Sequence, residues 1–182
     1  MKKIIASINR RMVIISLLLL AVFVIVILPI VNGVLLRKLH TALIPDMMIF
    51  YSPTILNNLA QIYGPEGIQV YIQSKYWFDI IWPLVYWFSL TVIIGHLCNM
   101  MKQKGIALFF PTLALLFDWG ENTLLIIFFS RYPQSTGILA YVASVLTAGK
   151  WVSIALSLVF ILMYLGRIRK KRLQKEEKNH NE

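Results

Sequence analysis

Four long apolar runs dominate the chain, and short polar segments separate them. The runs cover about residues 12–36, 76–98, 106–129 and 138–165. A helix that crosses a bilayer needs about 20 predominantly apolar residues, and each run reaches that length. The pattern predicts an all-α fold, a four-helix transmembrane bundle that forms one membrane domain over residues 1–182.

The first apolar run follows four basic residues, Lys2, Lys3, Arg10 and Arg11, as the apolar core of a secretory signal peptide does. Its apolar core of about 20 residues exceeds the roughly 7–15 residues of a signal peptide. No pattern of small residues that would suit cleavage follows it. We therefore expect a retained membrane anchor.

Residues 37–75, between the first two runs, are predicted to contain short helices. Ser52 and Pro53 fit the N-cap and the first helical position. Apolar residues follow at helical spacing, and Gly64 fits a helix stop. These helices either lie on the membrane surface or cap the bundle above a site, and the sequence leaves both alternatives open.

The composition excludes a soluble globular domain. Apolar residues make up 58% of the chain, charged residues make up 14%, and the mean hydropathy is +0.70. A soluble domain has roughly 25% charged residues. The formal net charge is +10, but the basic residues lie at the ends of apolar runs, which favours membrane orientation over nucleic-acid binding.

The distribution of Lys and Arg predicts the orientation of the bundle. Most of the 18 basic residues precede the first run, lie between the second and third runs, or follow the fourth. Because basic residues are enriched in cytoplasmic loops, we expect a multi-pass protein of the cell membrane with both termini in the cytoplasm. The opposite side then has only Arg37, Lys38, Lys75 and Arg131.

The basic tail, residues 166–182, is predicted to extend the fourth helix into the cytoplasm. Each Lys or Arg near an anionic membrane surface contributes about 1 kcal/mol of attraction. We therefore expect anionic membrane lipids as partners of the tail, and no nucleic acid.

Three ionisable residues, Asp118, Glu121 and Lys150, fall inside predicted spans. A charge near the membrane centre costs at least about 2.5–3.5 kcal/mol, so such residues face the bundle interior and find partners. Asp118, Glu121 and Asn122 share one helical face, because they are spaced i, i+3 and i+4. At the helical rise per residue, Asp118, Lys150 and Tyr86 reach a similar depth, roughly 15–18 Å from the outer surface.

These residues predict a polar cluster at mid-membrane, with Asp79 near its outer mouth. The leading hypothesis is binding or transport of a small polar or amphiphilic molecule. One alternative is an intramembrane enzyme in which Glu121 acts as general acid or base. Another is a structural or assembly subunit with a buried ion pair between Asp118 and Lys150. The predicted ligand-binding residues are Asp79, Tyr86, Asp118, Glu121, Asn122 and Lys150.

No cofactor and no metal site is predicted. Cys98 is the single cysteine, and His96 has no second ligand at helical spacing. Neither a phosphate-binding loop nor a nucleophile motif occurs. Small residues recur at four-residue spacing in the fourth run, as at Ala140 and Ser144, and predict close helix packing. A homo-oligomer is compatible with a bundle of four spans.

Several short motifs form a recognisable set. They are Tyr51-Ser52-Pro53, Tyr63-Gly64-Pro65-Glu66-Gly67 with Tyr71, Phe78-Asp79 with Pro83 and Tyr86, Asp118, Glu121-Asn122 and Lys150. With these motifs, residues 45–151 resemble a group of small bacterial four-span membrane proteins. No biochemical activity is established for that group, so the resemblance implies an integral membrane protein.

Overall fold

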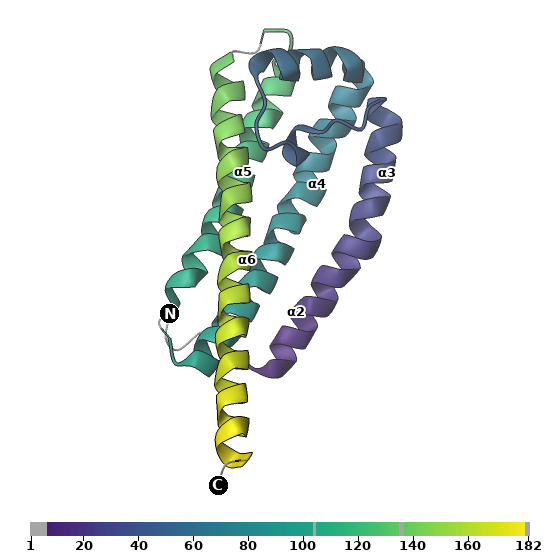
Figure 1. Ribbon diagram of the computed structural model, residues 1–182. Coiled ribbons are helices and arrows are strands. Elements are labelled where there is room, and N and C mark those ends of the chain that lie inside the picture. The colour runs from purple at the N-terminus through teal and green to yellow at the C-terminus, as the bar shows by residue number, and fades with distance from the viewer. Residues whose placement is uncertain (1–6, 104, 135–136, 181–182) are drawn as a thin grey trace.

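The computed structural model describes residues 7–103, 105–134 and 137–180. Helices account for most of these residues, and no strand occurs among them. The predicted all-α fold is therefore confirmed. The helices run along one another as a bundle, with α6 extending beyond it at one end (Figure 1).

The first long helix has three parts, α2 (Arg10–Val22), the π-helical turn η1 (Phe23–Ile27) and α3 (Leu28–Leu39). Asn9 caps its start, because the Asn9 side chain accepts a hydrogen bond from the Met12 backbone N–H at 3.0 Å. The wider turn lies directly before Pro29, which has no N–H and would clash with a carbonyl one turn back in a regular helix. This helix packs against α4.

Helix α4 (Pro53–Met101) consists of two helices that meet at Gly64. Ser52 caps the first of them by accepting a hydrogen bond from the Ile55 backbone N–H at 3.3 Å, as its sequence position predicts. Gly64 has φ 62° and ψ −179°, a conformation that essentially only glycine adopts, and the predicted helix stop is confirmed there. Residues 53–63 lie across the upper end of the bundle in Figure 1.

The helix that follows Gly64 corrects one expectation. Residues 37–75 are predicted to contain short helices, but the helix that follows Gly64 is long and continues without a break through Lys75 into the second predicted span. Lys75 is only 2% exposed. Asp46 of the preceding loop and Asp79, one turn further along the same helix, compensate the charge of Lys75 inside the bundle.

The second half of the chain forms η3 (Gly105–Leu108), α5 (Phe109–Ser130) and α6 (Gly137–His180). Helices α5 and α6 share the most extensive contact in the described chain. A Cβ atom at Gly149 would come within 2.9 Å of the Phe117 ring, so the two helices approach closely there. Ala140 and Ser144 are fully buried, and the predicted close packing of this helix is confirmed.

Four helical segments are long and apolar enough to cross a membrane, namely Arg10–Leu39, Pro53–Met101, Gly105–Ser130 and Gly137–Gln174. Each contains one predicted span. The start of α2 and the end of α6 lie at the same end of the bundle (Figure 1). Helix α6 continues to His180, so the basic tail extends the fourth helix as predicted.

The connection between α3 and α4 enters the bundle instead of running over its end. It contains the short helix η2 (Pro45–Met47), and Tyr51 is completely buried. The Tyr51 backbone N–H donates to Ser144 Oγ at 2.8 Å, and the Trp151 indole N–H donates to the Asp46 carbonyl at 3.3 Å. Side chains of α6 thus form hydrogen bonds with backbone groups of the loop that have no partner in a helix. This inserted loop, residues 40–52, carries Asp46 to the interior.

Candidate functional site

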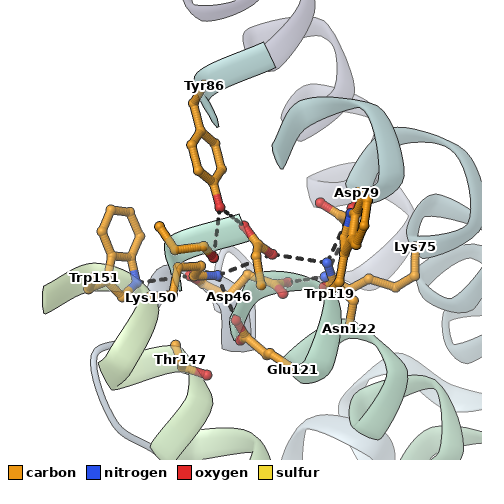
Figure 2. A network of polar contacts seen from close by, with 12 residues as sticks. Asp46, Lys75, Asp79, Tyr86, Trp119, Glu121, Asn122, Thr147, Lys150 and Trp151 are labelled. Atoms are coloured by element: carbon orange, nitrogen blue, oxygen red, sulfur yellow. Dashed lines mark hydrogen bonds and ion pairs between the residues drawn. The ribbon is translucent and has the colours of Figure 1, made fainter. Parts of the chain in front are cut away.

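The predicted convergence of Tyr86 and Asp118 is present. The Tyr86 hydroxyl donates to Asp118 Oδ2 at 2.9 Å, across the interface of α4 and α5 (Figure 2). Asn122, one turn further along α5, donates from Nδ2 to Asp118 Oδ1 at 3.0 Å and to the Asp79 carbonyl at 3.3 Å. The i, i+4 spacing of Asp118 and Asn122 places them on one face, as the sequence predicts.

Lys150 on α6 joins this group from the opposite side. Its ammonium lies 2.6 Å from Glu121 Oε2 and 3.7 Å from Asp118 Oδ1. The expected ion pair with Asp118 therefore exists, but Glu121 is the closer partner of Lys150. Figure 2 shows Glu121 directed toward Lys150.

A second lysine, which sequence reasoning assigned to a loop, completes the cluster. Lys75 forms ion pairs with Asp79, at 3.0 Å and one helical turn away, and with Asp46 of the inserted loop. Its ammonium also lies 4.8 Å from the centre of the Tyr71 ring. The Tyr71 hydroxyl donates to Asp46 Oδ2 at 3.2 Å. The buried polar cluster therefore consists of Asp46, Lys75, Asp79, Tyr86, Asp118, Glu121, Asn122 and Lys150.

The surroundings of Asp46 lower the pKa of its carboxyl group. Burial acts to raise the pKa of its carboxyl group, but the positive charges of Lys75 and Lys150 outweigh burial and hold the pKa below its ordinary value of 3.8. Tyr51, further along the same loop, accepts a hydrogen bond from the Thr147 hydroxyl at 3.0 Å. Burial and then the charge of Glu121 raise the pKa of Tyr51 well above its ordinary value, so its hydroxyl stays neutral.

A cavity of about 440 Å³ adjoins the cluster. Its volume is in the range of pockets that hold small organic ligands. Asp46, Lys75, Asp79, Asp118 and Lys150 line one part of it. The rest of its wall is largely apolar and comes from the first helix, α4 and α6, with Leu20, Val24, Leu28, Trp82, Leu90, Ile154 and Leu158.

Not every predicted site residue reaches this cavity. Asp79, Tyr86, Asp118 and Lys150 lie on its wall, whereas Glu121 and Asn122 are not among the residues that line it. Glu121 is fully buried behind Lys150. A ligand in the cavity therefore meets three aspartates, of which one, Asp46, comes from outside the predicted set.

Asp46 and Lys75 are the site residues that the sequence analysis missed. The i, i+4 spacing of Lys75 and Asp79 was an available signal, because such a pair shares a helical face. Asp46 follows Pro45 within the otherwise apolar segment 42–50, and an acidic residue in such a segment was a weaker signal.

The structure offers no arrangement for a metal ion within its described part. No group of three or more His, Cys, Asp or Glu residues there is placed to hold one. Cys98 is buried as a free thiol. The carboxylates of the cluster are instead bridged by the two lysines.

Comparison with protein-family models, with curated proteins and with solved structures finds no match for the chain. The resemblance of residues 45–151 to small bacterial four-span membrane proteins stays a prediction.

Proposed function

We propose that the chain is a multi-pass membrane protein that binds an amphiphilic molecule in the cavity beside the buried polar cluster. One observation carries the proposal, the continuity of a charged wall and a long apolar wall within a single cavity. From Asp79 to Leu90, eleven positions along α4, the cavity wall extends about 16 Å at the helical rise. A polar headgroup fits against the aspartates, and an apolar chain fits between the first helix and α6.

The membrane orientation belongs to the same proposal. Both termini lie on the cytoplasmic side, and residues 53–63 form a short extracytoplasmic helix that covers the end of the bundle. Lys75 is buried, so only Arg37, Lys38 and Arg131 remain as basic residues on the outer side. The excess of basic residues on the cytoplasmic side is therefore larger than the sequence alone indicates. The basic tail then contacts anionic lipids of the inner leaflet.

Thiol labelling of intact cells tests the orientation. In a Cys98→Ala background, Gln61→Cys places a thiol on the exposed face of the first part of α4, and Gln174→Cys places one on the tail. A membrane-impermeant maleimide is expected to label position 61 in intact cells and position 174 only after lysis. The reverse pattern would overturn the orientation.

Native mass spectrometry of the full chain in a mild detergent tests the binding proposal. We expect a co-purified amphiphile that is lost in Ile154→Trp, because Ile154 lines the cavity and a larger side chain there fills it. Val152→Trp is the matched control, since Val152 is exposed on the same helix. Retention of the molecule in both variants, or its absence from the wild type in every mild detergent, would contradict the proposal.

The geometry gives less support to Glu121 as the acid or base of an enzyme. Glu121 contacts Lys150 and has no surface on the cavity. A purely structural cluster is the competing outcome. It predicts that cavity-filling and surface variants of α6 behave alike in ligand retention, and that only stability responds to changes in the charged residues.

A further inference from the structure

Both lysines of the cluster already form ion pairs with carboxylates of the protein. The Lys75 ammonium lies between Asp46 and Asp79, and the Lys150 ammonium lies between Glu121 and Asp118. An anionic headgroup would have to displace a carboxylate from one of these pairs. Because a buried charge that loses its partner is costly, the cavity is poorly suited to a phosphate or a carboxylate.

The cluster also contains more carboxyl groups than ammonium groups. It contains the four carboxylates of Asp46, Asp79, Asp118 and Glu121 against two ammonium groups. Three of its buried acceptor atoms, Asp46 Oδ1, Glu121 Oε1 and Asn122 Oδ1, have no hydrogen-bond partner within the described residues. Of these three residues only Asp46 lines the cavity. A ligand there can therefore supply the hydrogen-bond donor that the Asp46 carboxylate lacks.

Where the ion-paired groups around Lys75 are exposed, the exposed atoms belong mainly to carboxylates. The side chains of Asp46 and Asp79 are 18% and 17% exposed, whereas the side chain of Lys75 between them is 1% exposed. All three line the cavity. A molecule that enters therefore meets carboxylate oxygens first, with the ammonium group behind them.

Aromatic side chains add to the preference for a cation. Trp82 and Tyr86 line the cavity, and a cation close to an aromatic face is stabilised by the ring quadrupole. The rings of Tyr71 and Trp151 also line it and already lie near the ammonium groups of Lys75 and Lys150. The described residues hold no arrangement that suits a metal ion. An organic ammonium fits better, because it donates several hydrogen bonds and can carry an apolar chain.

We infer that the ligand of this cavity is a cationic amphiphile, a long-chain amine whose ammonium group lies against Asp46, Asp79 and Asp118. This inference rests on the proposed function and specifies the headgroup. The apolar chain occupies the part of the cavity between the first helix and α6.

A headgroup series on the purified full chain tests the inference. Dodecylamine, dodecanol and dodecyl phosphate have the same chain and differ only in the headgroup. Their dissociation constants can be compared at pH 7 in one detergent by quenching of tryptophan fluorescence. We expect the amine to bind at least tenfold more tightly than the alcohol, and the phosphate to bind most weakly.

Two charge-removing variants separate the cavity from nonspecific attraction. Asp79→Asn is expected to weaken binding of the amine at least fivefold and to leave binding of the alcohol within twofold. Glu176→Gln, which removes a charge from the exposed tail, is expected to change neither. Should Asp79→Asn not fold, the headgroup series on the wild type and Asp118→Asn still decide the matter.

The outcomes distinguish this inference from the broader proposal. Equal or tighter binding of the alcohol or the phosphate overturns the cationic headgroup and leaves an amphiphile-binding cavity in place. Failure of all three probes to bind, together with no co-purified molecule, overturns both. An amine preference that survives Asp79→Asn and Asp118→Asn unchanged also overturns the inference, because binding then does not depend on the aspartates of the cavity.

Discussion

Lys75 and Asp46 form a buried ion pair between a helix and the loop that precedes that helix. The pair fixes the inserted loop against α4, and Asp79 shares the same ammonium group at 3.0 Å. Three aspartates thereby reach one cavity, although only two of them lie on helices that cross the bundle. The position of the loop is thus tied to the charge balance of the site.

Replacement of Lys75 by methionine is expected to destabilise the protein strongly. Lys75→Met leaves Asp46 and Asp79 next to each other without a cation, and breaking a buried pair costs about 3–5 kcal/mol. Thermal unfolding in detergent measures the loss. Lys38→Met, at an exposed position, is the control and is expected to change stability little; equal effects of the two changes would contradict the burial of Lys75.

The two carboxylate partners of Lys150 are expected to couple to it unequally. Glu121 lies 2.6 Å from the ammonium, and Asp118 lies 3.7 Å from it. Double-mutant cycles with Lys150→Met, Glu121→Gln and Asp118→Asn measure each coupling free energy, which is about 0.5–3 kcal/mol for contacting residues. We expect the larger value for the pair with Glu121. A larger value for the pair with Asp118 would show that Asp118 is the main partner.

The hydroxyl group of Tyr86 is expected to stabilise the site through Asp118. Tyr86→Phe removes the donor to Oδ2 at 2.9 Å, and a hydrogen bond to a charged group contributes about 1.5–3 kcal/mol. Tyr141→Phe is the matched control, because Tyr141 is exposed. If both variants unfold at the wild-type temperature, the bond to Asp118 contributes nothing to stability.

Gly64 is expected to tolerate no side chain without a cost in stability. Its backbone conformation, φ 62° and ψ −179°, disfavours any residue with a Cβ by about 1–3 kcal/mol. Gly64→Ala should lower the unfolding temperature, whereas Gly33→Ala, where an added Cβ meets nothing within 4 Å, should not. A neutral Gly64→Ala would mean that the two parts of α4 can join in another way.

Acid is expected to weaken the attachment of the inserted loop. The pKa of Asp46 is lower in the folded protein than its ordinary value of 3.8. Its contribution to stability is therefore fully present above pH 3.8 and is lost as the pH falls through the folded value. Unfolding temperatures between pH 5 and pH 2 should therefore fall less in Asp46→Asn than in the wild type. Parallel curves would show that the fold does not lower the pKa of Asp46.

The meeting of Tyr86, Asp118 and Lys150 could be predicted because helical rise fixes the depth of a residue once the ends of its span are known. The same reasoning failed for Lys75. A single charge at the end of an apolar run indicates a span boundary, and the only local sign that a carboxylate compensates Lys75 was its i, i+4 spacing to Asp79. The position of Asp46 was harder to predict, because a loop has no regular spacing from which the place of its residues can be calculated.

Apolar length and helical spacing are properties of contiguous sequence. They determined the four long helices, the Ser52 cap, the stop at Gly64 and the shared face of Asp118, Glu121 and Asn122. The partner of each buried charge depends instead on which helices pack together and where the inserted loop enters. Those are contacts between distant parts of the chain, so only the folded bundle brought Asp46 and Lys75 into the cluster and placed Glu121 behind Lys150.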